Sequence, residues 1–313
     1  MIRYLVRRLL FALPTLVAVL TVVFVLVRIV PGDPAQTILG DQASEEALVS
    51  LRHRLGLDRP ILGQYIAFLR SAALGDWGNS MVSGKPVMSE VAAVLPYTID
   101  LTVTSIILGI AIGMPLGAWS ALNRNTWADY ATRIGSLLGL SFPAFVSGIM
   151  LLLVFAIYFR WFPVISGGDL HDLSSRVRSL ALPAVNLALI MAAYITRVTR
   201  SSMLQVLGED FMRTARAKGV PRHALVWRHA LRNALIPVIT VVGLYLGILI
   251  GNSVLTEIVF NRPGLGKLIV GALNDRDYTM LQGLMVIYAL VVVVANLATD
   301  LAYGAVDPRI RVR

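Results

Sequence analysis

The chain has 313 residues, of which 57% are hydrophobic and only 15% are charged, and its net charge is +10. Soluble globular proteins have roughly 45–50% apolar and about 25% charged residues. This composition therefore excludes an ordinary soluble domain and indicates a protein that is solvated in part by lipid. The chain has no cysteine, which excludes disulfide bonds and cysteine-based zinc sites.

Six charge-free runs are long enough to cross a bilayer core, which takes about 20 apolar residues. In chain order they are 9–27, 101–123, 134–159, 179–196, 233–256 and 278–299, with lengths of 19, 23, 26, 18, 24 and 22 residues. The fourth run is the weakest, because it is short and contains Pro183 and Asn186. We predict an all-α, polytopic membrane protein with six transmembrane helices.

The first run follows three arginines, as the apolar part of a secretory signal peptide does. Its apolar stretch is long, however, and it ends in Arg28-Ile29-Val30-Pro31 without a small-x-small cleavage motif close behind. We therefore interpret residues 9–27 as a retained first helix.

The distribution of Lys and Arg among the loops predicts the orientation, because cytoplasmic loops carry the excess of basic residues. With the N-terminus inside, the cytoplasmic side holds 16 of the 28 basic residues and five acidic ones, a net charge of +11, against −1 outside. Both termini are then cytoplasmic. The basic excess is thus explained by membrane topology rather than by binding to nucleic acid.

This topology leaves a long extracytoplasmic segment, residues 31–99, between the first two helices. Residues 51–60 and 62–69 have the pattern of short amphipathic helices broken at Gly56 and Pro60. The predicted organisation is an N-terminal transmembrane helix (1–30), this segment, a five-helix membrane domain (100–305) and a cytoplasmic tail (306–313). The segment is too large for a mere connector and has the size of a small lid.

Small and polar residues recur within the predicted spans. Glycines at every fourth position let helix backbones approach closely, which suits ordinary packing within one bundle, a subunit interface or the lining of a translocation path. Polar groups inside a membrane face the bundle interior and either mark a path or join two helices by a hydrogen bond. The residues concerned are Gly109, Gly113 and Gly117, Gly243, Gly247 and Gly251, Asn186, Asn296 and, next to the second span, Asp100.

The cytoplasmic loop between the fourth and fifth spans, about residues 205–232, contains the most informative segment. Glu209 and Asp210 stand where a helix N-terminus favours negative charge, and Lys218 and Gly219 stand where its C-terminus favours a cation and a left-handed residue. This predicts a short helix of about nine residues at the membrane surface. Such a compact helix is suited to docking in a groove of a partner protein.

At this loop the chain resembles the permease subunits of binding-protein-dependent ABC importers, which carry an "EAA" loop. The version here looks like that of the dipeptide, oligopeptide, nickel and glutathione subgroup. It departs from the general pattern in having Arg213 in place of an acidic residue, as that subgroup does. The matching segments are 209–219 (EDFMRTARAKG), 229–237 (HALRNALIP), 31–34 (PGDP), 55–60 (LGLDRP), 141–145 (SFPAF), 260–266 (FNRPGLG) and 307–311 (DPRIR).

The resemblance implies a type I importer permease in the cell inner membrane that works with a second permease, homologous but different, two cytoplasmic ATPases and an extracytoplasmic solute-binding protein. ATP and Mg would bind the ATPases, with no cofactor in this chain. The short helix would dock in an ATPase cleft. Basic residues there could pair with acids on the ATPase or with anionic lipid. The contact candidates are Phe211, Arg213, Thr214, Ala215, Arg216, Ala217, Lys218 and Gly219.

Other functions have weaker support. Gly264-Leu265-Gly266-Lys267 lacks the spacing and the Ser/Thr of a phosphate-binding loop. Asp169, His171 and Asp172, and likewise Asp275 and Asp277, are most simply solvated turns rather than metal sites. An ion-gradient-driven secondary transporter remains the alternative, although the charge-free spans offer no evident ion site. We predict no catalytic or metal-binding residue, and the substrate-binding residues stay undetermined. Within the resembling subgroup, di- or oligopeptides or related small solutes are the expected cargo, although the sequence does not say which one.

Overall fold

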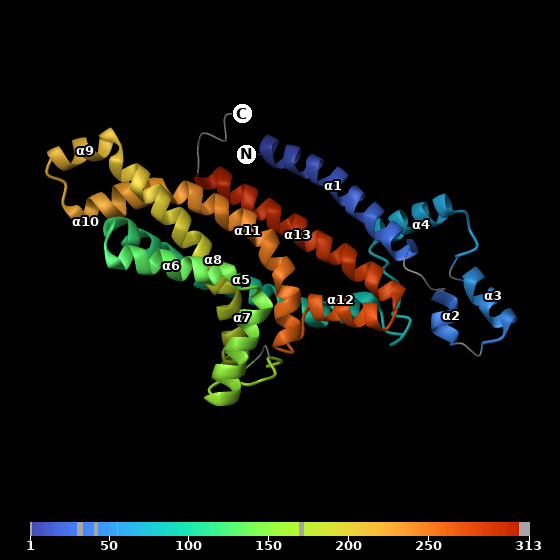
Figure 1. The fold of residues 1–313 in the computed structure, drawn as a ribbon. Helices are drawn as coiled ribbons and strands as arrows, with labels where there is room; N and C mark the ends of the chain where they lie inside the picture. Colours follow the sequence, from blue (N-terminus) through green and yellow to red (C-terminus); the bar gives the residue numbers. More distant parts are fainter. Residues whose placement is uncertain (1, 30–33, 41–42, 55, 169–171, 307–313) are drawn as a thin grey trace. The chain divides into compact units, whose positions relative to one another are not determined.

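The computed structural model describes residues 2–29, 34–40, 43–54, 56–168 and 172–306, and this part of the chain is helical without any β-strand. The described residues form two compact units. One unit contains residues 97–263 and the C-terminal stretch from 295, and the other contains residues 2–96 and 264–294. Figure 1 traces the chain through both units.

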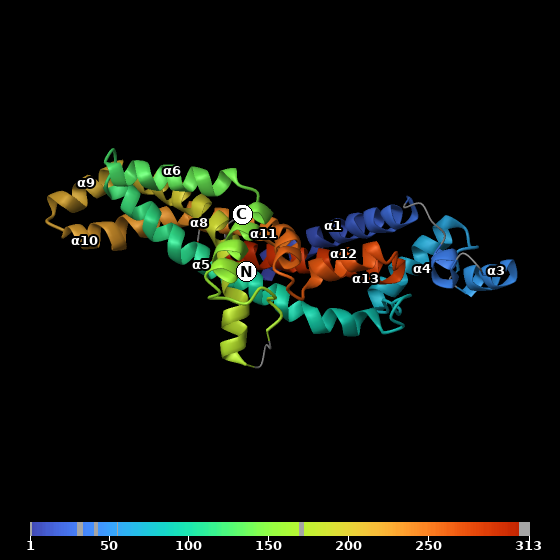
Figure 2. The same cartoon turned by 60° about the horizontal axis from the view of Figure 1, so that its bottom comes forward.

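The first unit is built from long helices. They are the part of α5 (Val87–Leu122) from residue 97, α6 (Trp127–Ser141), α7 (Ala144–Leu151) with the π-helical η1 (Leu152–Tyr158), α8 (Leu173–Gly208), α9 (Asp210–Ala217), α10 (Arg222–Ala224), the π-helical η2 (Leu225–Ala230), α11 (Leu231–Val259) and the end of α13 (Tyr278–Val306). Figure 2 shows α5, α6, α8 and α11 side by side, with α9 at one end of them.

Helix α8, which contains the weakest of the six predicted runs, is the central helix of this unit. It packs against α6, α7 and α11, and 72% of its apolar window is buried, more than in any other candidate span of the described residues. Asn186, which made this run the weakest of the six, helps to hold α8 in its central position. The side chain of Asn186 is fully buried, donates to the carbonyl of Ala144 at 3.0 Å and accepts from Ser147 Oγ at 2.7 Å. Asn186 therefore joins α8 to α7 by hydrogen bonds.

The first glycine stripe packs within the chain. A Cβ atom at Gly109 would lie 2.8 Å from the side chain of Met191, and one at Gly113 would lie 2.7 Å from the carbonyl oxygen of Ala192. These distances are too short for any side chain, so the stripe lets α5 approach α8 closely. The second stripe differs, because a Cβ atom at Gly251 would meet no atom within 4 Å.

The third predicted span, 134–159, is not one continuous helix. Helix α6 ends at Ser141, and the helical segment Ala144–Tyr158 leaves it at an angle of 103°. Phe142 between them is extended, with φ −91° and ψ 130°, because the ring of Pro143 disfavours the helical conformation of the preceding residue. Pro143 in turn stands directly before the first residue of α7.

The structure contains fewer unbroken apolar spans than the six predicted. Among the described residues, four single helices are long and apolar enough to cross a membrane, and the bent pair brings the number to five. Helix α1 (Ile2–Ile29) covers the first predicted run, but its apolar stretch within the described residues, Leu13–Leu26, is shorter than a span. The count of six spans therefore stays a prediction.

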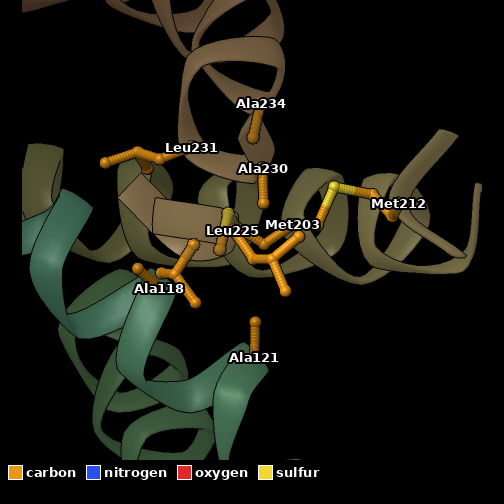
Figure 3. Close-up of a cluster of buried hydrophobic side chains, with 9 residues drawn as sticks. Ala118, Ala121, Met203, Met212, Leu225, Ala230, Leu231 and Ala234 are labelled. Atoms are coloured by element: carbon orange, nitrogen blue, oxygen red, sulfur yellow. The ribbon is translucent and has the colours of Figure 1, made fainter. Parts of the chain in front are cut away.

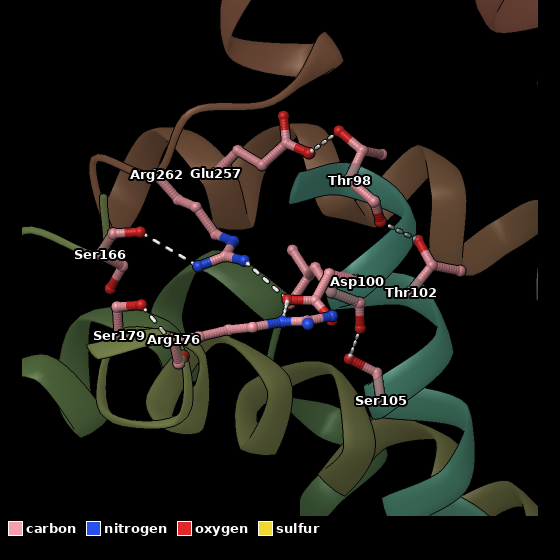
Figure 4. Close-up of polar contacts among 10 residues, drawn as sticks. Thr98, Asp100, Thr102, Ser105, Ser166, Arg176, Ser179, Glu257 and Arg262 are labelled. Carbon is pink, nitrogen blue, oxygen red and sulfur yellow. Dashed lines mark hydrogen bonds and ion pairs between the residues drawn. The ribbon is translucent and has the colours of Figure 1, made fainter. Parts of the chain in front are cut away.

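Charged side chains gather at the end of this unit where α8 begins and α11 ends, and Figure 4 shows their contacts. Asp100 of α5 accepts two hydrogen bonds from Arg176, at 2.6 and 3.0 Å, and one from Arg262 at 3.5 Å. Arg262 also donates to the carbonyl of Ser166 at 3.1 Å, and nearby Thr98 donates to the buried Glu257 at 2.7 Å. The predicted polar residue Asp100 thus ties α5 to α8 and to the segment after α11.

The second unit contains α1, α2 (Pro34–Leu39), α3 (Glu45–Arg54), α4 (Ile61–Leu74), the first part of α5, α12 (Leu265–Asn274) and the first part of α13. Helices α3 and α4 match the two short helices expected in the segment 31–99. The predicted end of that segment at residue 99 does not coincide with the end of an element, because α5 begins at Val87 and continues without a break. Phe24 of α1 packs against Tyr65 and Phe68 of α4.

Asp277 is not in a solvated turn as predicted. Its side chain is 3% exposed, accepts a hydrogen bond from Ser80 Oγ at 2.5 Å and another from the backbone N–H of Met280 at 3.0 Å. The carboxylate therefore caps the first turn of α13 and holds the loop around Ser80. Ser80 is nearly 200 positions away from Asp277 in the chain, so no local sequence pattern predicts this contact.

Candidate functional site

The short helix predicted between the fourth and fifth spans is α9. Glu209 is extended, with φ −69° and ψ 151°, and by itself separates the end of α8 from the start of α9. After α9, Gly219 adopts φ +77°, and the backbone N–H of Val220 returns to the carbonyl of Ala215 at 3.2 Å. This left-handed closure is the C-terminal motif for which glycine is favoured.

Helix α9 is held on its own chain by an apolar cluster at the ends of three long helices (Figure 3). Met212 is the member from α9, and its side chain is 1% exposed. The remaining members of the cluster are Ala118 and Ala121 of α5, Met203 of α8, Leu225, Val226 and Ala230 of η2, and Leu231 and Ala234 of α11. One buried cluster includes side chains from all these elements, so α9 is packed against the ends of α5, α8 and α11.

The eight predicted contact residues are not equivalent. Ala215 is partly buried and packs against the same cluster as Met212. Phe211 is 44% exposed although it is large and apolar. The other six, Arg213, Thr214, Arg216, Ala217, Lys218 and Gly219, are exposed. The structure thus brings seven of the eight to the surface of the loop and turns Ala215 partly towards the chain itself.

The basic residues of α9 and of the position after it make few contacts with other described residues. Arg213 contacts Asp210 at 3.4 Å, one helical turn away, with both side chains more than three-quarters exposed. An exposed pair of this kind contributes about 0–1 kcal/mol to stability and restrains neither side chain strongly. Arg216 and Lys218 lie on the surface. All three cations are thus available to an acidic partner or an anionic surface.

A second polar centre near the loop was missed by the sequence analysis. Asp129 of α6 is fully buried and forms a bidentate pair with Arg200 of α8, at 2.6 and 2.8 Å. The same carboxylate accepts from Ser120 Oγ at 2.6 Å and from the backbone N–H of Asn125 at 3.0 Å. Every contact is between residues on different elements or across a turn, so the only sequence signal is one acidic residue among basic ones.

The acidic residues and histidine considered as possible metal ligands are described only in part. Within the described residues no cluster of three or more histidine or acidic side chains is placed to hold a metal ion. Asp169 and His171 lie outside the described residues. Asp172 caps α8 and accepts hydrogen bonds from the backbone N–H groups of Ser174 and Ser175. Its side chain is thereby used in helix capping.

The amino-acid sequence matches two models of known protein families. Residues 113–312 match the family described as "Binding-protein-dependent transport system inner membrane component", and residues 1–102 match the N-terminal part of such membrane components. The chain belongs to this family of permease subunits. It is therefore a multi-pass inner-membrane component of an ABC importer, which works with ATPase subunits and a binding protein, and it is a transport subunit rather than an enzyme.

Two curated relatives match almost the whole chain. The dipeptide transport system permease protein DppB of Alkalihalophilus pseudofirmus is 40% identical over 99% of this chain and 100% of its own length. The glutathione transport system permease protein GsiC of Escherichia coli strain K12 is 41% identical over 99% of both chains. The chain is thus similar to two permeases that are named for different peptide solutes.

Solved structures support the fold. An inward-facing structure of the MetNI methionine ABC transporter matches 70% of this chain and 97% of its own with a TM-score of 0.58 at 19% identity. An amino acid ABC transporter crystallised with histidines matches 71% of this chain and 94% of its own with a TM-score of 0.52 at 14% identity. At these identities the likeness establishes the shared permease fold alone.

Proposed function

We propose that this permease subunit imports dipeptides, oligopeptides or related small solutes, and that α9 couples its spans to ATP hydrolysis in a partner ATPase. The observation that carries the coupling role is the position of α9. Its inner face is buried among the ends of α5, α8 and α11, while Phe211 and the basic side chains face outwards. A helix anchored in this way would move three long helices together when a partner moves it.

The coupling contacts are assigned to the exposed residues. Phe211 supplies the apolar anchor, Thr214, Ala217 and Gly219 supply a close-fitting surface, and Arg213, Arg216 and Lys218 supply charge. Ala215 packs α9 against the rest of the chain, and only its exposed part contacts the ATPase. ATP and Mg bind the ATPase in this scheme, and the chain itself holds no cofactor.

We infer the assembly and orientation of this permease by analogy with its family. The chain pairs with a second permease, homologous but different, and with two ATPases on the cytoplasmic side. The basic excess in the loop of α9 supports cytoplasmic placement of that loop and of both termini. Residues 31–99 would then lie on the outer side, where a solute-binding protein delivers its ligand. An ATP-driven importer explains these features better than an ion-gradient-driven transporter does.

The solute class is supported by the relatives, because DppB is named for dipeptides and GsiC for glutathione, which is itself a small peptide. The test is to measure binding of dipeptides, longer peptides and glutathione to the binding protein of this system, followed by uptake into cells that have and lack this chain. Uptake of a peptide that depends on the chain supports the proposal. A binding protein that takes only non-peptide solutes contradicts the peptide assignment.

The coupling role is tested best at Phe211. Ala215 packs on the chain itself and Gly219 has a positive φ, so substitutions there would disturb the fold of the loop as well as its contacts. We expect Phe211→Asp to abolish co-purification of the ATPase and transport. Val49→Asp is the matched control, because it places the same charge at an apolar position of α3 that is 57% exposed. Retention of both properties by Phe211→Asp would contradict the proposal.

A further inference from the structure

A hollow of about 600 Å³ lies between α6 and α8, near the end of α8 that leads into α9. Three arginines line it, Arg133, Arg197 and Arg200, together with the hydroxyl-bearing Ser201 and Ser202. No carboxylate is among the residues that line it in the described part of the chain. The hollow is therefore strongly cationic and has hydrogen-bond donors on its wall.

Two of the three positive charges are not balanced. Arg200 is neutralised by its bidentate pair with the buried Asp129. Arg133 lies over the ring of Tyr130, 5.7 Å from the ring centre, and makes no ion pair with a described carboxylate. Arg197 likewise has no ion pair among the described residues, and both of these side chains are exposed. The hollow thus presents two guanidinium groups that have no carboxylate partner among the described residues, and guanidinium groups favour phosphate oxygens as hydrogen-bond acceptors.

The position of Arg133 along α6 indicates its depth in the membrane. Trp127 and Tyr130, at the start of α6, are 80% and 51% exposed, and such aromatic side chains are typical of the membrane–water interface. Arg133 follows Trp127 by six residues, or about 9 Å along a helix. Its guanidinium is therefore expected at the level of the lipid headgroups, where phosphate groups are within its reach.

Beyond Arg133 the surface of α6 becomes apolar. Ile134, Leu137 and Leu138 are 56%, 54% and 54% exposed, and Leu137 also lines the hollow. In a membrane this surface is covered by acyl chains. A cationic mouth followed by an exposed apolar helix face is complementary to one molecule that carries a phosphate and hydrocarbon chains.

We propose that this hollow binds an anionic phospholipid, whose phosphate contacts Arg133 and Arg197 and whose acyl chains run along Ile134, Leu137 and Leu138. Basic pockets between transmembrane helices on the cytoplasmic side are suited to such headgroups. The bound lipid fills the space between α6 and α8 beside the Asp129–Arg200 pair. The proposal concerns a part of the chain other than the coupling surface of α9.

The test uses the importer complex purified in mild detergent, with retained lipid measured by native mass spectrometry during titration with phosphatidylglycerol or phosphatidylcholine. We expect phosphatidylglycerol to bind more tightly than phosphatidylcholine. We expect Arg133→Gln/Arg197→Gln to bind phosphatidylglycerol roughly thirtyfold more weakly, since each basic residue near an anionic lipid contributes about fivefold. Arg222→Gln/Arg228→Gln removes two exposed positive charges outside the hollow and should bind as the unmodified protein does.

Two further measurements separate the possible ligands. Leu137→Gln should weaken phosphatidylglycerol binding through the acyl chains while leaving the arginines in place, and Arg133→Lys/Arg197→Lys should restore much of the binding that the Gln variant loses. Equal lipid retention by the two double Gln variants would overturn the proposal. Displacement of the lipid by millimolar inorganic phosphate would assign the hollow to a soluble anion instead. Loss of a protein subunit with unchanged lipid retention would make it a protein interface, and the lipid assignment would then be wrong.

Discussion

Asp129 and Arg200 join α6 to α8 through two parallel hydrogen bonds of 2.6 and 2.8 Å, with the carboxylate fully buried and the guanidinium 21% exposed. Arg200 lies on α8 about two turns before that helix ends at Gly208. A buried pair contributes little net stability compared with an apolar replacement, but the loss of one partner leaves an isolated charge.

Removing Asp129 should therefore be much more harmful than removing both partners. We expect Asp129→Leu to lower the free energy of unfolding by about 3–5 kcal/mol. The double variant Asp129→Leu/Arg200→Met should recover a large part of that loss. Thermal unfolding of the detergent-solubilised chain measures both. If the double variant is less stable than Asp129→Leu, the pair is not the reason for the loss.

The close approach of α5 to α8 predicts a position-specific effect of a single methyl group. A Cβ atom at Gly113 would lie 2.7 Å from the carbonyl oxygen of Ala192, so Gly113→Ala should destabilise the chain by about 1–3 kcal/mol. Gly135→Ala is the control, because a Cβ atom at Gly135 of α6 would meet nothing within 4 Å. Equal melting temperatures of the two variants would show that α5 and α8 are not in this contact.

The buried contact of α9 with the apolar cluster can be weakened without changing the exposed residues of the helix. Met212 is 1% exposed, and truncation of a buried methionine costs about 2–5 kcal/mol. We expect Met212→Ala to speed hydrogen exchange of the α9 amides and to reduce transport while leaving Phe211 available. Met150→Ala, at a position of α7 that is 58% exposed, should change neither. Normal exchange and transport in Met212→Ala would mean that α9 does not depend on this contact.

The two arginines that share Asp100 should respond differently to its loss. Arg262 is 1% exposed, whereas the side chain of Arg176 is 41% exposed and can reach water. We expect Asp100→Asn to destabilise the chain mainly by stranding Arg262, at a cost of about 3–5 kcal/mol. Adding Arg262→Met should therefore recover more stability than adding Arg176→Gln, as measured by thermal unfolding. The reverse order would contradict this account.

Local sequence patterns predicted the position of α9 but not which of its side chains are buried. Glu209, Asp210 and Gly219 predicted its position to within a residue or two, because capping and a left-handed turn depend on neighbours in the chain. The same pattern could not tell that Ala215 turns partly inwards and Phe211 outwards. That difference depends on how α9 packs against the apolar cluster, whose members on α5 lie far away in the chain.

For the spans too, the sequence predicts local properties, whereas the packing partners depend on the tertiary structure. Composition predicts that the helices are apolar, and Pro143 marks the point where the third one breaks, yet the angle of 103° depends on how its two arms pack. The glycine stripe at Gly109 and Gly113 predicts close approach but does not name α8 as the neighbour. Likewise no local signal distinguishes the buried Asp277 from an ordinary turn residue.

The sequence by itself determined that this is a helical membrane protein, which of its segments are apolar, and that a short capped helix lies in a basic loop between two of them. These properties follow from hydropathy, charge and backbone preference, which act between residues close in the chain. Only the tertiary structure decided that α9 is seated on the ends of α5, α8 and α11 and that Asp129 meets Arg200. Such pairings arise from packing between distant segments, whose partners are set by the shape of the whole unit.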